Sequence, residues 1–374
     1  MAEPLGVGLV GAGGFGEFCS AAFQQMREVR LVAVADVVEA RAAACAPPGA
    51  KVYTRYAAVL ADPAVDIVAI NTPPYLHAAM VVEGAAAGKH LFVEKPLATS
   101  MLDAVAAVRA ARRAGVLLTV DYVLRFHPLH VLAASIVASG AFGSLQHWSL
   151  ENYATDEPLL PDHWFWDTDQ SGGVHVEHGV HFIDLCNQMV GRAPDSVGGT
   201  AQRRADGRVD RVSATARYGD DVLATFFHSF TQIRAIEQTT IRVGCARGHL
   251  TLEGWIPTQL AINGLTDAAG LDALRRMLGN YLRIERRFAG EETIFRHGGA
   301  TETLAAEVSA TVTAPDRQGD YRRAIQDVMR NLVSAIRGVE LLRVTPEDGL
   351  QSLAVALAAR DTPCGGMLPT WQIE

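Results

Sequence analysis

Short apolar runs alternate with longer helical patterns through the first third of the chain. The apolar runs are β-prone and contain few polar positions, which predicts strands buried on both faces. Between them, apolar residues recur at the spacing of one helix face. Strands that alternate with helices form right-handed βαβ crossovers, so we predict an α/β fold with a doubly wound parallel sheet of the Rossmann type. The predicted strands are Leu5–Val10, Leu31–Ala35, Ile67–Ile70, Leu91–Val93 and Val116–Val120, and the predicted helices are Glu17–Val29, Arg55–Ala61, His77–Ala87 and Leu102–Ala114.

From Leu145 onward, apolar and polar residues alternate within short segments. A period of two predicts strands that have one packed face and one free face. We therefore expect a second sheet in this half of the chain. Its predicted strands are Gln146–Tyr153, Arg211–Tyr218, Val222–Phe230, Thr239–Val243 and His249–Leu252.

Four further segments of this half have simpler patterns. Asp195–Asp210 is rich in Gly, Arg and Asp, which predicts a hairpin loop. Leu271–Arg286 has the spacing of an amphipathic helix, within a polar stretch, residues 266–320, that we interpret as either a lid or an interface insertion. Regular apolar spacing in Tyr321–Ile336 and Pro346–Ala359 predicts two structural helices.

A glycine-rich turn joins the first strand to the first helix. Gly11–Gly16 has the order GxGxxG, which predicts a dinucleotide site because the glycines let the backbone approach a pyrophosphate at the helix N-terminus. The alternative is an ordinary tight turn. Asp36 ends the second strand, where a carboxylate binds ribose hydroxyls and repels a 2′-phosphate. The next residue, Val37, is not an arginine that would hold such a phosphate, so the pattern favours NAD over NADP.

Titratable residues are concentrated in the segment Ser171–Asp184, which we expect to be a glycine turn followed by a helix. Glu177, His181 and Asp184 are spaced i, i+4 and i+7, which predicts that they share one helical face. A histidine beside a carboxylate can carry proton transfer near neutral pH. This segment is therefore the candidate catalytic centre.

A metal site is the alternative interpretation of the same segment, because His163, His175, His178 and His181 gather around Glu177. His178 and His181 are three residues apart, unlike the i, i+4 pair of the HExxH zinc proteases. We therefore predict that no metal is bound.

Aromatic residues precede this segment. Trp164 and Trp166 lie beside polar residues within Asp162–Asp167, a combination that suits a carbohydrate, whose C–H face can pack on a ring while its hydroxyls accept and donate hydrogen bonds. The alternative is that both are core or interface residues.

Composition limits the class of protein. The 374 residues are 49% hydrophobic and 20% charged, which is typical of a globular protein of two domains. A net charge of -8, without a long basic run, argues against nucleic-acid binding. No apolar run is long enough to span a membrane, and Leu5–Val10 is interpreted as a strand rather than a signal segment. Five scattered cysteines, Cys19, Cys45, Cys186, Cys245 and Cys364, indicate reduced thiols and a cytoplasmic location.

Four motifs occur in an order that resembles the Gfo/Idh/MocA family of glucose–fructose oxidoreductases, inositol dehydrogenases and rhizopine catabolism proteins. They are GxGxxG at Gly11–Gly16, TPPxxH at Thr72–His77, EKP at Glu94–Pro96 and GGxxxExGxHxxD at Gly172–Asp184. The resemblance runs from about Leu5 to the last predicted helix. It implies a Rossmann domain over residues 1–121 and an α+β domain over residues 122–374, with a large, mostly antiparallel open sheet that forms a homodimer or homotetramer.

The resemblance also implies roles for individual residues. Lys95 stands beside the nicotinamide and the reacting hydroxyl, the Lys95–Pro96 bond is expected to be cis, His181 takes the proton, and Glu177 orients the pair. Glu177 departs from the aspartate of the family pattern, which leaves the substrate open. The predicted cofactor-binding residues are Gly11, Ala12, Gly13, Gly14, Phe15, Gly16, Asp36, Val37, Thr72, Pro73, His77, Glu94 and Lys95, and the predicted substrate-binding residues are Tyr122, Arg125, Trp164 and His178.

These features predict an NAD-dependent dehydrogenase that acts on a secondary hydroxyl of a sugar, inositol or sugar derivative. Two alternatives remain open. One is a glycosidase or lyase that works through a transient keto-sugar with tightly held NAD, and the other is a non-catalytic dinucleotide sensor.

Overall fold

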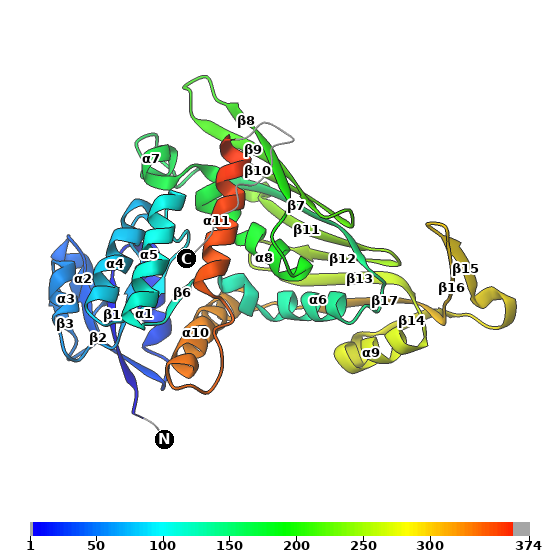
Figure 1. The fold of residues 1–374 in the computed structure, drawn as a ribbon, viewed down its shortest axis with the longest axis horizontal. Helices are drawn as coiled ribbons and strands as arrows, with labels where there is room; N and C mark the ends of the chain where they lie inside the picture. The colour runs from blue at the N-terminus through cyan, green and yellow to red at the C-terminus, as the bar shows by residue number, and fades with distance from the viewer. Residues whose placement is uncertain (1–2, 362–374) are drawn as a thin grey trace.

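The computed structural model describes residues 3–361, and its first part is a six-stranded parallel sheet flanked by helices (Figure 1). The strand order is β3-β2-β1-β4-β5-β6, which confirms the predicted doubly wound sheet. The order reverses between β1 and β4, and sheets of this kind bind ligands in the crevice at the carboxyl ends there. The strands are Leu5–Val10 (β1), Val29–Ala35 (β2), Lys51–Tyr53 (β3), Ile67–Ile70 (β4), His90–Val93 (β5) and Leu118–Val120 (β6).

The helices of this part follow the predicted ones, with different ends. The first helix begins inside the glycine motif and ends at Phe23, because Val29 already belongs to β2. A short strand and a short helix, β3 and α2, were not predicted. The helices are Gly14–Phe23 (α1), Glu39–Cys45 (α2), Tyr56–Leu60 (α3), His77–Ala86 (α4) and Met101–Ala114 (α5).

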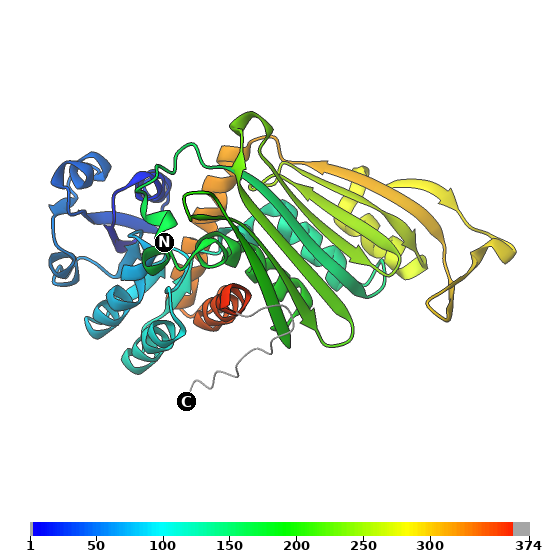
Figure 2. The same ribbon diagram turned by 90° about the horizontal axis from the view of Figure 1, so that it is seen from above.

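The second part is a nine-stranded sheet in the order β14-β17-β13-β12-β11-β7-β10-β9-β8, seen from above in Figure 2. Strands β7 and β10 run parallel and the other described pairings are antiparallel, so the predicted fold class is confirmed. The strands are Leu145–Thr155 (β7), Ser196–Arg203 (β8), Val209–Tyr218 (β9), Val222–Gln232 (β10), Gln238–Cys245 (β11), Gly248–Glu253 (β12), Gln259–Thr266 (β13), Arg283–Arg287 (β14) and Ala306–Thr313 (β17), and the separate hairpin is Ile294–His297 (β15) with Ala300–Thr303 (β16).

Two predictions for this half are wrong. Asp195–Asp210 is not simply a loop, because half of it is the edge strand β8, which pairs with β9. The helix predicted over Leu271–Arg286 ends at Leu278, where Gly279 takes a positive φ, and its basic end forms strand β14 instead. Charged residues suit an exposed edge strand as well as a helix end, so the pattern alone did not separate the two.

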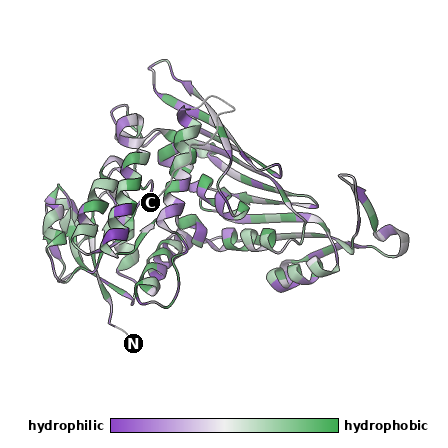
Figure 3. Cartoon of the chain, viewed as in Figure 1, coloured by the Kyte–Doolittle hydropathy of each residue, from purple (hydrophilic) through white to green (hydrophobic). Residues whose placement is uncertain are grey.

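One face of the large sheet is covered by helices, and hydrophobic residues recur along its strands (Figure 3). Trp148, Leu150 and Phe226 point into this packed face and are buried. Residues of the opposite face, such as Leu223, are exposed. The helices of this half are Pro128–Ala138 (α6), Thr168–Ser171 (α7), the π-helical turn His175–Gly179, Val180–Val190 (α8) and Ala268–Leu278 (α9), and the 3₁₀ turns of the whole chain are Pro74–Leu76, Val123–Phe126, Trp164–Trp166, Arg234–Ile236, Gly279–Tyr281 and Gly290–Thr293.

The last two helices, Arg317–Ile336 (α10) and Pro346–Asp361 (α11), lie between the two sheets (Figure 1). The Gln326 amide of α10 donates to the Ala22 carbonyl of α1 at 2.9 Å. The Thr119 hydroxyl of β6 donates to the Val344 carbonyl just before α11 at 3.0 Å. The end of the chain thus joins both halves and holds the crevice between them.

Two findings concern the predictions about membrane spans and cysteines. No helix in residues 3–361 is long and apolar enough to cross a membrane. Cys19, Cys45, Cys186 and Cys245 are buried free thiols, and Cys364 lies outside the described residues.

Candidate active site

A cavity of about 810 Å³ opens at the carboxyl ends of β1, β2, β4 and β5. Its walls include most of the predicted cofactor residues, which come from four separate segments of the first half. Those on the wall are Gly11, Gly13, Gly14, Phe15, Gly16, Asp36, Val37, Thr72, Pro73, Glu94 and Lys95.

The glycine turn has the shape that a dinucleotide requires. A Cβ on Gly16 would lie 1.8 Å from the Gly11 carbonyl oxygen, so this position admits only glycine. Cβ atoms on Gly13 and Gly14 would meet nothing within 4 Å, so these two residues face open space in the cavity. The backbone N–H groups at the start of α1 are therefore accessible to a pyrophosphate, so the turn fits the binding of NAD(P).

Asp36 lies on the same wall, at the end of β2. Its carboxylate accepts hydrogen bonds from the backbone N–H of Ala12 at 2.8 Å and of Val38 at 2.9 Å. Arg41, which sequence reasoning missed, lines the cavity from α2. Both an acidic and a basic side chain thus border the place where an adenosine ribose would lie.

Lys95 and Glu177 form a buried ion pair that connects the two halves of the chain. The Lys95 ammonium lies 2.8 Å from Oε1 of Glu177 and donates to the Glu177 carbonyl at 2.8 Å. Burial by itself lowers the pKa of Lys95, but the carboxylates of Glu177 and Glu94 outweigh it and the pKa is raised. Burial likewise raises the pKa of Glu177, and Lys95 outweighs it so that the pKa is lowered. Both groups are charged at neutral pH. The Lys95–Pro96 bond is cis, as expected.

The segment that carries Glu177 is not the regular helix that we predicted. His175–Gly179 forms a π-helical turn, and the α-helix begins only at Val180. Turns of this kind shift the side chains that follow and are common at functional sites. Glu177 reaches Lys95, whereas Asp184 binds Arg125 instead of joining the Lys95 group.

His181 lies deeper than predicted. It is 4% exposed and, among the described residues, does not belong to the wall of the cofactor cavity or of the second cavity described below. Its ring packs edge-on against Trp255 at 5.3 Å and lies 6.3 Å from the ring of His178. Burial, with a further contribution from the charge of Lys95, lowers its pKa well below the usual value, so the imidazole is neutral and able to accept a proton.

A second cavity, of about 780 Å³, adjoins the first. His163, Trp164 and Glu177 line both cavities, and His178 lines the second. Burial lowers the pKa of His178 to about 4. A ligand in the second cavity therefore meets Glu177, the partner of Lys95, where the two cavities join.

Besides His181, and Arg125 which is described below, three predicted site residues lie off the walls of both cavities. Ala12 is buried and contributes its N–H to Asp36. The ring nitrogens of His77 lie 2.6 Å and 2.7 Å from the carbonyl oxygens of Pro96 and Thr72, so this residue joins two cavity loops from behind. Tyr122 is buried behind His181, with its hydroxyl 2.6 Å from that of Ser352.

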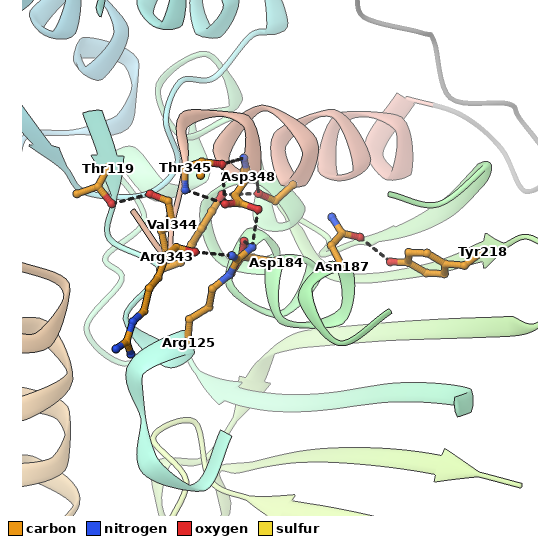
Figure 4. Close-up of polar contacts among 11 residues, drawn as sticks. Thr119, Arg125, Asp184, Asn187, Tyr218, Arg343, Val344, Thr345 and Asp348 are labelled. Carbon is orange, nitrogen blue, oxygen red and sulfur yellow. Dashed lines mark hydrogen bonds and ion pairs between the residues drawn. The ribbon is translucent and has the colours of Figure 1, made fainter. Parts of the chain in front are cut away.

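Arg125, predicted to bind substrate, is held in a network of ion pairs (Figure 4). Its guanidinium makes two hydrogen bonds of 2.6 Å to the carboxylate of Asp184 and one of 2.9 Å to Asp348. A further N–H donates to the Arg343 carbonyl. The side chain is 8% exposed, and its donors are directed at protein groups.

Several site residues were not predicted. The side-chain amide of Asn71 lines the cofactor cavity with buried atoms that have no partner, and an Asn at the end of a buried strand was the available signal. Asp121 follows β6 beside Glu94, and burial raises the pKa of its carboxyl well above the usual value. Trp255 stacks on His178 in the second cavity, and no sequence pattern pointed to it.

Within the described part of the chain, no group of three or more His, Cys, Asp and Glu side chains is placed to hold a metal ion. The absence of a metal therefore stays a prediction for the whole protein.

Comparison with known proteins identifies the family. A model described as "Oxidoreductase family, NAD-binding Rossmann fold" matches residues 5–122, and one described as "GFO/IDH/MocA C-terminal domain" matches residues 130–251. The chain is 33% identical over 247 residues to D-xylose 1-dehydrogenase (NADP(+)) 2 of Haloferax volcanii, covering 63% of this chain and 74% of that protein. It is 26% identical over 309 residues to scyllo-inositol 2-dehydrogenase (NAD(+)) of Bacillus subtilis, covering 83% and 78%.

A solved structure of levoglucosan dehydrogenase, in complex with NADH and levoglucosan, superposes with a TM-score of 0.79 at 19% identity, covering 98% of this chain and 100% of that one. This likeness confirms the fold over nearly the whole chain. The family models and the Haloferax relative show that the chain belongs to the Gfo/Idh/MocA family and is an NAD(P)-binding oxidoreductase.

Proposed function

We propose that this enzyme oxidises a secondary hydroxyl of a sugar, inositol or sugar derivative with NAD. The observation that carries the proposal is the junction of the two cavities at the Lys95–Glu177 pair. A dinucleotide in the first cavity and a polyol in the second would meet there. The relatives named for inositol and xylose dehydrogenases support the substrate class.

When bound, the nicotinamide accepts a hydride from the carbinol carbon. The residues of the chain supply the rest: the Lys95 ammonium donates a hydrogen bond to the reacting oxygen, and Glu177 holds Lys95 in place. Trp164 offers an aromatic wall to the C–H face of the ring, and neutral His181, which lies behind the cavity wall and 6.3 Å from the ring of His178, is the base that we propose for the hydroxyl proton.

The direct test incubates the purified protein and NAD with inositols, aldoses, anhydrosugars and glycosides while NADH absorbance is followed. NADH formation with one polyol class is expected. Glycoside cleavage without net NADH would instead support the lyase alternative, and NAD binding without any turnover would support the sensor.

The assignment of the base has its own test. Proton transfer by a positioned base contributes roughly 10²–10⁴ in rate, so His181→Ala should nearly abolish turnover while NAD still binds. His178→Ala is the matched comparison, because His178 lines the cavity three residues earlier. If His181→Ala kept most activity and His178→Ala lost it, the base would be His178.

A further inference from the structure

Four histidine rings form a row behind the proposed site, of which three are buried and that of His178 is partly exposed to the substrate cavity. His175 and His178 belong to the π-helical turn, His181 to α8 and His228 to β10. Ring centroids are 6.3 Å apart for His181 and His178, 5.5 Å for His178 and His228, and 5.9 Å for His228 and His175. Consecutive rings are thus near neighbours along the whole row.

Gly179 lies beside the far end of the row. A Cβ on Gly179 would lie 3.4 Å from Nε2 of His228 and 3.5 Å from Nδ1 of His175, which are ordinary contact distances. Both rings therefore lie next to the same backbone position. The π-helical turn supplies this arrangement together with the position of Glu177.

Most ring nitrogens of the row have no hydrogen-bond partner. Both nitrogens of His228, Nε2 of His178 and Nδ1 of His181 are buried without a hydrogen bond, whereas the ring of His175 lies beside the backbone of Ser213, whose hydrogen bond opposes the effect of burial on the pKa of His175. Buried polar atoms in native proteins are paired with protein groups or ordered water, so these nitrogens suit water bridges between neighbouring rings. A neutral imidazole carries one donor and one acceptor, which is what a proton shuttle needs.

The row runs between two separate cavities. His178 lines the proposed substrate cavity. His175, at the other end, lines a different cavity of about 710 Å³, which is also bordered by the exposed carboxylates of Asp169 and Asp206. A substrate bound in the substrate cavity would limit the access of water from that side, whereas the 710 Å³ cavity, the outer cavity of the row, does not contain Lys95 or Glu177.

We propose that His181, His178, His228 and His175 form a proton relay from the active site to the outer cavity. The proposal rests on the proposed function. Oxidation breaks a C–H bond and an O–H bond, the C–H electron pair leaves as hydride to NAD, a C=O bond forms, and the proton passes along the row to water beside Asp169 and Asp206. The charged groups that act on its inner end are Lys95 and Glu177, and His228 and His175 act on each other.

The neutral charge state of the imidazole rings is consistent with a proton being transferred along the row. Burial lowers the pKa of His175 and of His178 to about 4 and that of His228 well below its usual value. These rings are therefore neutral at neutral pH, so each has a free nitrogen lone pair that can accept a proton in transit.

Stopped-flow measurement tests the relay in weakly buffered solution, with NADH absorbance reporting hydride transfer and a pH indicator reporting proton release. In the wild type both signals should rise together. In His228→Gln and His175→Gln, proton release should lag behind hydride transfer by about tenfold or more, with a larger solvent isotope effect on kcat. His130→Gln is the matched control, because His130 in α6 is also a buried histidine with unpartnered nitrogens and lies outside the row.

Rescue separates a relay from structural support. Imidazole diffusing into the outer cavity should restore proton release in His175→Ala, whereas pyrrole, a ring of the same size without a basic nitrogen, should not. Circular dichroism identifies variants that fail to fold. If His228→Gln does not fold, the His175 variants still test the relay.

Unchanged proton release in the folded variants would overturn the relay alone. Equal loss of hydride transfer and proton release, without rescue by imidazole, would also overturn it and leave the histidines a supporting role. A wild-type protein that forms no NADH with any polyol would overturn the proposed function, and the relay with it.

Discussion

Lys95 and Glu177 are the side chains whose substitution should report most directly on the site. They are 9% and 15% exposed and lie 2.8 Å apart. Lys95→Met leaves the Glu177 carboxylate buried without a partner, and breaking a buried pair in this way costs roughly 3–5 kcal/mol. We expect a loss of that size in the free energy of unfolding, measured by urea denaturation, together with loss of turnover.

The double variant Lys95→Met/Glu177→Gln is the control, because it removes both charges and should cost less than the sum of the single changes. Its difference from the wild type also has a defined pH dependence. Glu177, with a lowered pKa, stabilises above about pH 4 and loses this effect as pH falls; Lys95, with a raised pKa, stabilises below about pH 10 and loses it as pH rises. The difference should be flat between these limits, and additive costs would show that the pair does not interact.

Asp36 and Arg41 should together set the choice of cofactor, and we propose that Asp36 decides for NAD. Asp36→Asn removes the negative charge but keeps an oxygen that can accept from the backbone. Since like charges in contact cost several kcal/mol, the kcat/KM for NADP should rise about tenfold or more relative to that for NAD.

Arg41 provides the control for this prediction. If its guanidinium binds the 2′-phosphate in the variant, then Asp36→Asn/Arg41→Ala should lose the gained activity with NADP, measured by the same steady-state kinetics. An Asp36→Asn enzyme that still rejects NADP would show that another part of the cavity selects the cofactor.

The contact between helices α8 and α11 depends on Arg125. Its guanidinium binds Asp184 of α8 and Asp348 of α11, so we interpret it as a packing residue of this junction (Figure 4). Arg125→Ala should lower the free energy of unfolding by roughly 3–5 kcal/mol, because Asp184 stays buried without its partner. Thermal unfolding and the KM for substrate, measured together, check this.

Arg125→Lys is the comparison, since it keeps the charge and loses the planar fork, and it should be intermediate in stability. A raised KM with unchanged stability would instead support the substrate-binding role that the sequence suggested.

The whole molecule leaves one face of its large sheet uncovered by its own helices. Leu223 on β10 is 47% exposed there, and Tyr153 and Phe227 pack their rings together on the same face at 5.4 Å. We propose that this face joins copies of the chain in a homodimer or homotetramer. Leu223→Glu should shift the sedimentation coefficient toward the monomer, because it places a charge in the contact.

Leu341→Glu serves as the control, because Leu341 is 88% exposed on the connection between α10 and α11. It should leave the assembly unchanged. Equal behaviour of the two variants, or a wild-type monomer, would contradict an interface on this sheet.

The pattern of the chain was sufficient for five of the six strands of the parallel sheet, because those strands are local apolar segments joined to periodic helices by short turns, and it missed the three-residue strand β3. It was less informative in the second half. Strand β8 contains two adjacent glycines and strand β14 consists mostly of charged residues, so only their pairing with β9 and β17 makes them strands. Short motifs likewise indicated the glycine turn and Lys95, since their chemistry depends on neighbours in the sequence.

Side-chain partners were decided by tertiary structure alone. Glu177 and Lys95 are 82 residues apart in the sequence, and Arg125 and Asp184 are 59 residues apart. Local spacing therefore could not predict these pairs. The π-helical turn, the approach of Trp255 to His178 and the place of Arg41 on the cofactor wall also depend on how distant elements pack. Sequence therefore determined which chemical groups this protein carries and which local elements hold them. Packing between distant elements determined which groups face each other, because that follows from the burial of whole helices and strands.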